Sequence, residues 1–240
     1  MAEKFKYQCN KPARLLYSSI TVKSTPKGVL NAEPKFSATF GIDKADFDEI
    51  VKLEVQAIKS ETGGFTKPAD YYLGCTSGEV AANRVLQKAQ FDSQGKPADE
   101  VLKIMERAES RASLYRPYGG IMTAASKFDV EVAKLENGKI VDIDISTDAN
   151  RALAAKEMFY GGAYVVPAVA FQGYRAKTVD AKPGCTAFLQ NVLFVANGER
   201  LGGMASSNKD VFAGFSDFDP TALTGGIEAS ADAELDEAAF

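Results

Sequence analysis

Most of the chain consists of short runs of β-branched and aromatic residues, each closed by a turn signal. Residues 127–135 and 139–145 are two such runs, and they flank Asn137-Gly138. A two-residue turn of this kind needs positive φ at both positions, which Asn and Gly tolerate, so the pair predicts a β-hairpin. Alternation then assigns inward and outward positions: inward Val141, Ile143 and Ile145, and outward Asp142 and Asp144.

Four further strands are predicted at residues 12–24, 34–42, 160–174 and 185–196. Pro167 lies inside the third of these, and a proline there indicates an edge strand or a bulge. Five or more strands with Gly-rich bends favour a small barrel or sandwich. The core is expected to contain the aromatic residues of these runs: Phe36, Phe40, Phe128, Phe188 and Phe194.

Three windows have helical periodicity. The first follows Asp43, whose side chain is suited to cap a helix with an acidic first turn. The other two, around Ala82–Ala89 and Val101–Ala108, form a helical insertion at about residues 77–112. The expected fold is therefore mainly β, with inserted or flanking helices.

Charge is divided unevenly along the chain, which has a net charge of −4. Eight of the 32 acidic residues lie from Asp210 onward and none of the 28 basic residues does, so residues 1–209 carry +4 and residues 210–240 carry −8. The last stretch is also poor in core-forming residues and ends on Phe240. We expect a folded domain over 1–209 and a mobile acidic tail over 210–240. A basic body beside an acidic tail indicates a nucleic-acid partner.

The absence of histidine excludes Ser-His-Asp triads, Cys-His pairs and histidine-based metal sites. Cys9, Cys75 and Cys185 are scattered, which favours reduced, buried thiols over a zinc site. No apolar run is long enough to span a membrane. We therefore expect a protein that is not an enzyme, has no metal and no cofactor, has no membrane partner, and is cytoplasmic.

Several tyrosines stand beside arginine or lysine. Single-stranded nucleic acids are held by cations along the phosphates and by aromatic faces on which unpaired bases stack. The clearest clusters are Tyr115-Arg116-Pro117-Tyr118 and Tyr174-Arg175-Ala176-Lys177. Weaker examples contribute the candidates Arg14, Tyr17, Lys35 and Lys127.

Short motifs along nearly the whole chain resemble a phage and prophage family of single-stranded-DNA-binding proteins. They are Arg14-Leu15-Leu16-Tyr17, the segments 34–46, 157–164 and 188–192, Asn197-Gly198-Glu199-Arg200-Leu201-Gly202-Gly203, and Asp210 to Phe212. The resemblance implies an OB-fold-like β-barrel. It adds Tyr160 and Tyr164 as shared positions, whereas residues 77–112 and the Tyr115–Tyr118 cluster match no motif of the family.

The acidic C-terminus that ends on Phe also resembles the tails of replication single-strand binders from other phages. We therefore predict sequence-independent binding of single-stranded DNA in support of phage DNA replication, recombination and repair, in the cytoplasm of the host cell if the protein is phage-encoded. The tail is expected to compete for the DNA groove when DNA is absent and to dock on phage or host replication and recombination proteins. Its docking residues are predicted to be Asp232, Glu234, Asp236, Glu237 and Phe240.

Three alternatives stay open. Strand annealing for recombination is the nearest, because the sequence alone does not separate it from support of replication. A phage assembly or structural protein with an acidic tail is the second. A metal-dependent nuclease is the third, and it would need another acid beside Asp142 and Asp144. The sequence leaves site size, cooperativity and oligomeric state open.

Overall fold

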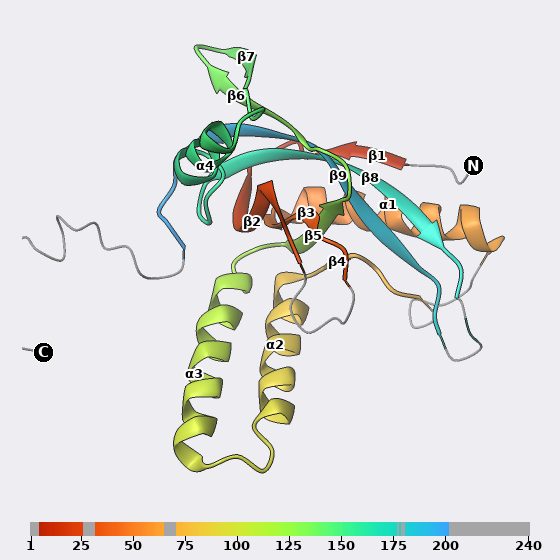
Figure 1. The fold of residues 1–240 in the computed structure, drawn as a ribbon. Helices are drawn as coiled ribbons and strands as arrows, with labels where there is room; N and C mark the ends of the chain where they lie inside the picture. The colour runs from red at the N-terminus through yellow and green to blue at the C-terminus, as the bar shows by residue number, and fades with distance from the viewer. Residues whose placement is uncertain (1–4, 26–31, 65–70, 177, 179–180, 202–240) are drawn as a thin grey trace, which may run out of the picture. The chain divides into compact units, whose positions relative to one another are not determined.

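The computed structural model describes residues 5–25, 32–64, 71–176, 178 and 181–201 (Figure 1). These residues form nine strands and four helices. The strands are β1 (Phe5–Gln8), β2 (Ala13–Ser24), β3 (Lys35–Ile42), β4 (Cys75–Thr76), β5 (Gly120–Ser126), β6 (Glu131–Glu136), β7 (Lys139–Asp142), β8 (Tyr164–Tyr174) and β9 (Gly184–Ala196). The helices are α1 (Lys44–Thr62), α2 (Gly78–Asp92), α3 (Ala98–Tyr115) and α4 (Asp148–Glu157). The four helices contain almost as many residues as the nine strands. The fold is therefore less dominated by β structure than the sequence predicts.

All nine strands belong to one mixed sheet with the order β1-β8-β2-β3-β5-β9-β6-β7, and β4 pairs with β5. β9 runs parallel to β5 and to β6, and the other pairs are antiparallel. β8, which already pairs with β1 and β2, also pairs with β9 over most of its length. The hydrogen-bonded path from β8 through β2, β3, β5 and β9 therefore returns to β8.

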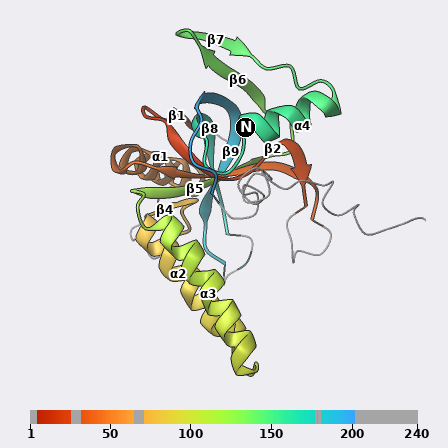
Figure 2. The ribbon, with the colours of Figure 1, turned by 90° about the vertical axis from the view of Figure 1, so that its left-hand side faces the viewer.

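Alternation along the strands puts large apolar residues into one core. Leu15, Phe40 and Phe171 have no exposed surface, and burial of each contributes about 1.5–3 kcal/mol. α1 packs against β8 and contributes Ile50 and Ile58 to the same core (Figure 2).

α2 and α3 lie side by side as an antiparallel pair that projects away from the sheet (Figures 1 and 2). Their base forms a second, smaller core with β2 and β5, in which Leu16, Tyr115 and Ile121 are buried. Ser77 caps α2, because its side chain accepts a hydrogen bond from the backbone N–H of Val80 over 3.3 Å. The two helices occupy the region where the sequence predicts an insertion.

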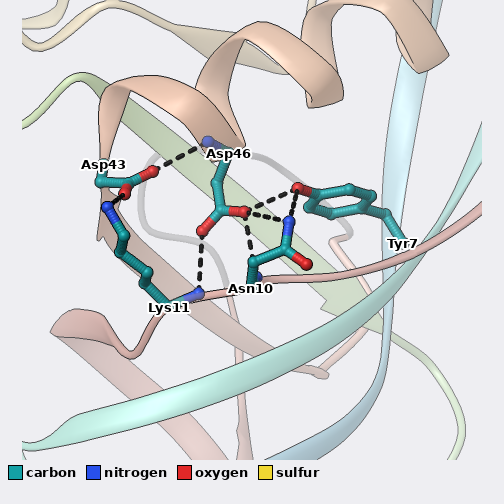
Figure 3. Close-up of polar contacts among 5 residues, drawn as sticks. All are labelled: Tyr7, Asn10, Lys11, Asp43 and Asp46. Carbon is teal, nitrogen blue, oxygen red and sulfur yellow. Dashed lines mark hydrogen bonds and ion pairs between the residues drawn. The ribbon is translucent and has the colours of Figure 1, made fainter.

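The N-terminal segment is tied to the start of α1 by buried Asp46 (Figure 3). The Tyr7 hydroxyl donates to Asp46 Oδ1 over 2.6 Å, and the backbone N–H groups of Asn10 and Lys11 donate to the same carboxylate over 3.0 and 3.3 Å. Asp43 caps the helix as predicted, accepting from the Asp46 N–H over 2.8 Å. Burial, and then the hydrogen bond to Asp46, raise the pKa of Tyr7.

The predicted turn is confirmed, since Asn137 and Gly138 have φ of 50° and 76°. Its two strands are shorter than predicted. Val141 is 40% exposed rather than inward, because β7 is the last strand of the sheet and all four of its residues are exposed. Of the two structures predicted for Pro167, the edge strand is wrong, because β8 is flanked on both sides. The bulge agrees with a register shift one residue later, at Ala168/Val169.

The expectation that Phe128 lies in the core is wrong. Phe128 is 82% exposed, because it follows the end of β5 instead of lying within a strand. Phe36 and Phe40 are buried as predicted, and Phe188 and Phe194 are half-buried. The sequence interpretation also missed α4, which Thr147 caps by accepting from the N–H of Asn150.

The three cysteines are buried and free, as predicted. Burial raises the pKa of Cys9 and of Cys185 to about 12, so neither thiol is a reactive thiolate near neutral pH. None of the helices in the described segments is long and apolar enough to cross a membrane.

Candidate nucleic-acid interface

A β-bulge in β2 places two predicted binding residues on one face of the sheet. Arg14 pairs with Gly41 and Leu15 with Phe40, but the next partner, Thr39, pairs with Tyr17. Leu16 is therefore an extra residue, and its side chain is buried in the second core. Without the bulge, residues three apart would point to opposite faces of the sheet.

Tyr17 belongs to a face of β2, β3 and β5 that is lined mainly by small side chains. Thr39 pairs with Tyr17 on one side and with Thr123 on the other, and the two threonine hydroxyls are 3.0 Å apart. Two residues farther along each strand, on the same face, the paired residues are Ser19, Ser37 and Ala125. We call these six residues the outer face. Small side chains leave room for a ligand to lie against the strands.

One end of the outer face is bounded by α3. The rings of Tyr17 and Tyr115 meet edge to face with centroids 6.5 Å apart, and Tyr17 is 42% exposed. The Arg111 guanidinium lies 5.3 Å from the Tyr17 ring and 5.6 Å from the Tyr115 ring, and its Nε donates to the Tyr115 hydroxyl over 3.0 Å. Burial raises the pKa of Tyr17, so its ring stays neutral near neutral pH. A neutral, partly exposed ring beside a guanidinium is suited to stack a base and contact its phosphate.

Beyond Tyr17 the same side of the sheet carries a second aromatic and cationic cluster. The Tyr118 ring covers Gly41, where an added Cβ would lie 2.6 Å from ring carbons. The Arg14 guanidinium lies 4.6 Å from the centroid of Tyr164, which is 40% exposed, and its Nη2 donates to the carbonyl oxygen of Glu199 over 2.6 Å. Burial raises the pKa of Tyr118, while nearby Arg14 opposes the rise.

Tyr160 is fixed at a neighbouring turn. Its hydroxyl accepts from the Gly198 N–H over 3.0 Å and lies 2.9 Å from the Gly198 carbonyl oxygen. The Arg200 guanidinium covers the Tyr160 ring at 3.9 Å, and Arg200 Nη2 donates to the carbonyl oxygen of Lys156 over 2.6 Å.

A groove of about 480 Å³ runs along the edge of β2, lined by residues 16–24 and by Tyr160, Gly161 and the end of α4. It forms because β2 pairs with β8 only at Ala13 and Arg14, which leaves the rest of this edge without a neighbouring strand in the described chain. Tyr17 and Tyr160 both line this groove.

Lys35 and Lys127 lie at the opposite end of the outer face from Tyr118. Lys35 precedes Phe36, whose partner Ser126 precedes Lys127, so the two lysines occupy neighbouring positions on β3 and just after β5. Lys127 forms an ion pair with Glu33. Lys35 and Gly41 are six positions apart on β3, which corresponds to about 20 Å along the strand.

Other predicted residues lie elsewhere. Tyr174 is at the far end of β8 from Tyr164, about 33 Å along the strand. Arg175 donates to the carbonyl oxygen of Glu61 at the end of α1 over 2.7 Å. Arg116 is ion-paired with Glu109 at 2.7 Å. Lys177 and the five predicted tail residues (Asp232, Glu234, Asp236, Glu237 and Phe240) lie outside the described residues.

Sequence reasoning missed Arg111 and Arg200. A signal existed for each. Arg111 is four residues before Tyr115 on a helix, which places the two side chains on one face. Arg200 lies inside the Glu199-Arg200-Leu201-Gly202-Gly203 motif, which contributed only to the family resemblance, although its guanidinium lies over the Tyr160 ring.

Asp144 of the predicted hairpin has a local structural role. Asp144 accepts from the Ser146 N–H over 2.8 Å and from Asn150 Nδ2 over 2.9 Å, and hydrogen bonds from Ser146 are the main cause that lowers its pKa. In the part of the chain that the structure covers, no group of three or more Cys, Asp or Glu side chains is arranged to hold a metal ion.

This fold is shared with the solved single-stranded-DNA-binding protein of bacteriophage Enc34. The protein from bacteriophage Enc34 aligns with a TM-score of 0.50 and 17% identity over 87% of this chain and 89% of that one. Its complex with single-stranded DNA aligns with a TM-score of 0.50 and 18% identity over 83% and 89%. A single-stranded-DNA-binding protein of bacteriophage T7 aligns with a TM-score of 0.44 and 11% identity over 97% of this chain and 100% of that one. No family model and no curated protein matches the sequence.

Proposed function

We propose that this chain is a sequence-independent single-stranded-DNA-binding protein of the phage family that its motifs resemble. The observation that carries the proposal is the outer face, where an exposed Tyr17 ring and the Arg111 guanidinium adjoin a floor of small residues. Stacked bases contribute about 1–3 kcal/mol each, and every base can stack, so binding of this kind needs no particular sequence. No catalytic step is required.

The strand pairings support an OB-type barrel made of β2, β3, β5, β8 and β9. Their pairings form a cycle, and β5 and β9 are the parallel pair. An OB fold is a five-stranded, partly open barrel whose second and third strands bind oligonucleotides on one face. In chain order those two strands are β3 and β5, which carry most of the outer face.

The bound strand would extend along this face from Tyr118 toward Lys35 and Lys127. Arg14, Tyr160 and Tyr164 are proposed to contact DNA at the first end, with Arg200 supporting Tyr160. Tyr115 is buried, so its proposed role is to hold Tyr17 and Arg111 in place. For Arg116, Tyr174, Arg175 and Lys177 direct contact with DNA stays a prediction.

The acidic tail, residues 210–240, is proposed to compete with DNA for the cationic groups of the body and, once released, to dock on replication or recombination proteins. The −8 charge of the tail and the +4 charge of residues 1–209 support the competition. Phe240 would act as the aromatic anchor of the docked tail. We place these events in phage DNA replication, recombination and repair.

The direct test is titration of fluorescently labelled oligo-dT with the full-length protein, followed by anisotropy at several salt concentrations. We expect binding that a double-stranded competitor does not displace, with log K falling by about 0.7 per phosphate contact for each unit of log salt. Failure to bind, or equal displacement by double-stranded DNA, would exclude the proposal.

A further inference from the structure

The antiparallel pair α2–α3 carries a groove of about 440 Å³ on one of its sides. Its floor is apolar and its rim is cationic. The floor is made of Val85, Ala89, Ile104 and Ala108, and the rim of Arg84, Lys88, Arg107 and Arg111, with Asp92 as the one acid of the lining. We call it the hairpin groove.

The cations follow helix periodicity, so they form two rows. Arg84 and Lys88 are four residues apart on α2, and Arg107 and Arg111 are four residues apart on α3. Residues at this spacing lie on one helix face, about 6 Å apart along the axis. The rim therefore presents two rows of positive charge to whatever lies in the groove.

The groove lining contains four cations and one acid. Asp92 is bound to Lys88 at 2.8 Å. Arg84 and Arg107 are exposed and form no ion pair with any residue that the structure describes. Of the other acids on these helices, Glu100 is bound to Lys96 and Glu109 to Arg116, and Glu79, Asp99 and Glu106 are not part of the groove lining. Cations gathered without partners repel one another and favour an external anion.

Arg111 connects the hairpin groove to the outer face. It lines the groove and also lies over the rings of Tyr17 and Tyr115. A strand that stacks on Tyr17 therefore meets the first cation of the groove without leaving the protein surface. No aromatic residue lines the groove, so it offers contacts to phosphates and none to stacked bases.

We propose that the hairpin groove binds the phosphates of the same single strand beyond the outer face. This inference rests on the proposed function. It divides the binding site into a segment that stacks bases, near Tyr17, and a segment that only neutralises phosphates, between α2 and α3.

The test uses the full-length double variant Arg84→Gln/Arg107→Gln, which removes two rim cations while Gln keeps the helix propensity of the sites. Binding is measured with a short oligo-dT of about four nucleotides and a longer one of about 16. The chain has no tryptophan, so quenching of intrinsic tyrosine fluorescence reports stacking. The control, Lys52→Gln/Lys96→Gln, removes the same charge from positions outside the groove lining.

For the longer oligonucleotide we expect the double variant to reduce the salt slope by about 1.4, since each lost phosphate contact accounts for about 0.7. If the double variant and wild type bind equally at about 1 M salt, the double variant would bind about 25-fold more weakly than wild type at about 0.1 M. Tyrosine quenching at saturation and binding of the short oligonucleotide should be unchanged. Arg84→Lys/Arg107→Lys, which keeps the charge, should restore the slope.

Three results would overturn the inference, and they are distinguishable. If wild type does not bind oligo-dT, the proposed function itself fails. If wild type binds and the double variant keeps its slope, or binds more tightly, the groove is not a DNA subsite, and tighter binding would assign it to an acidic protein segment. An equal loss for both oligonucleotides would place the two arginines in the first segment instead.

Discussion

At the scale of single residues, the position of Tyr118 depends on the absence of a side chain at Gly41. A Cβ at this position would lie 2.6 Å from the Tyr118 ring, closer than van der Waals contact allows. The ring therefore packs directly on the backbone of β3, next to the pair of Arg14 and Tyr164.

Gly41→Ala should destabilise the protein by about 1–3 kcal/mol, because the ring or the strand must move. The same substitution in a Tyr118→Ala background should have little effect, since the clashing ring is gone. Urea unfolding of the four proteins of this double-mutant cycle measures the coupling. Equal losses in both backgrounds would show that Tyr118 does not pack on Gly41.

Tyr17 is the proposed stacking surface of the outer face, so its ring should carry a large part of the affinity. Tyr17→Ala should weaken binding to oligo-dT by about 1–3 kcal/mol, whereas Tyr17→Phe should retain most of the affinity. Anisotropy titration measures both. Tyr72→Ala, which removes a 58% exposed tyrosine near the β8–β9 loop, is the matched control and should leave binding unchanged. A larger loss for Tyr72→Ala than for Tyr17→Ala would contradict the site.

At the scale of elements, the predictable features were those with local signals. Asn137-Gly138 fixed the turn between β6 and β7, and Asp43 fixed the start of α1. The bulge at Leu16 has no such signal, because it depends on the partner strand β3 and on a second core formed by α2 and α3. That bulge decides that Arg14 and Tyr17 share a face. Periodicity within β2 alone would have separated them.

Buried Glu54 connects α1 to β4 and gives the fold a pH dependence. Its Oε1 accepts from the N–H groups of Gly74 and Cys75 over 3.0 and 3.1 Å. Burial raises its pKa from 4.5 to about 8, although the two hydrogen bonds oppose the rise.

Because the folded pKa is the higher one, the folded state binds the proton more tightly than the unfolded chain. The contribution of Glu54 to stability is complete below about pH 4.5 and is lost as the pH rises to about 8, at about 1.4 kcal/mol per pKa unit. Glu54→Gln keeps an acceptor but does not ionise, so its unfolding free energy should fall less over this range. Urea unfolding across the pH series tests this. Parallel curves for the two proteins would show that Glu54 does not titrate in this window.

At the scale of the whole molecule, the order of strands could not be predicted. β9 pairs with β5, β6 and β8, and β8 pairs back to β2, so neighbours in the sheet are far apart in the chain. Tyr17, Lys35 and Lys127 come from three such segments. Sequence could name them as candidates from their aromatic or basic character. Only the pairing of β2, β3 and β5 brings Tyr17 and Lys35 to one face and places Lys127 just after the end of β5. Tyr174 and Arg175 have the same local pattern and lie elsewhere.

Charge over the whole chain predicts how the tail affects binding. Replacing Asp232 and Asp236 by Asn, and Glu234 and Glu237 by Gln, in the full-length protein removes half of the −8 charge of residues 210–240. If the tail competes with DNA, this variant should bind oligo-dT more tightly than wild type at low salt, and the difference should shrink as salt screens the charges. Anisotropy titrations at several salt concentrations measure it. A difference that does not depend on salt would argue against competition.

The most direct test of the central claim is photocrosslinking of bromodeoxyuridine-substituted single-stranded DNA to the full-length protein, with the crosslinked peptides identified by mass spectrometry. The outer face predicts crosslinks to the β2 peptide that contains Tyr17 and to peptides around Tyr118 and Tyr164, all reduced by unlabelled oligo-dT. Crosslinks confined to the β8–β9 loop around Tyr174, or none that oligo-dT competes for, would contradict it.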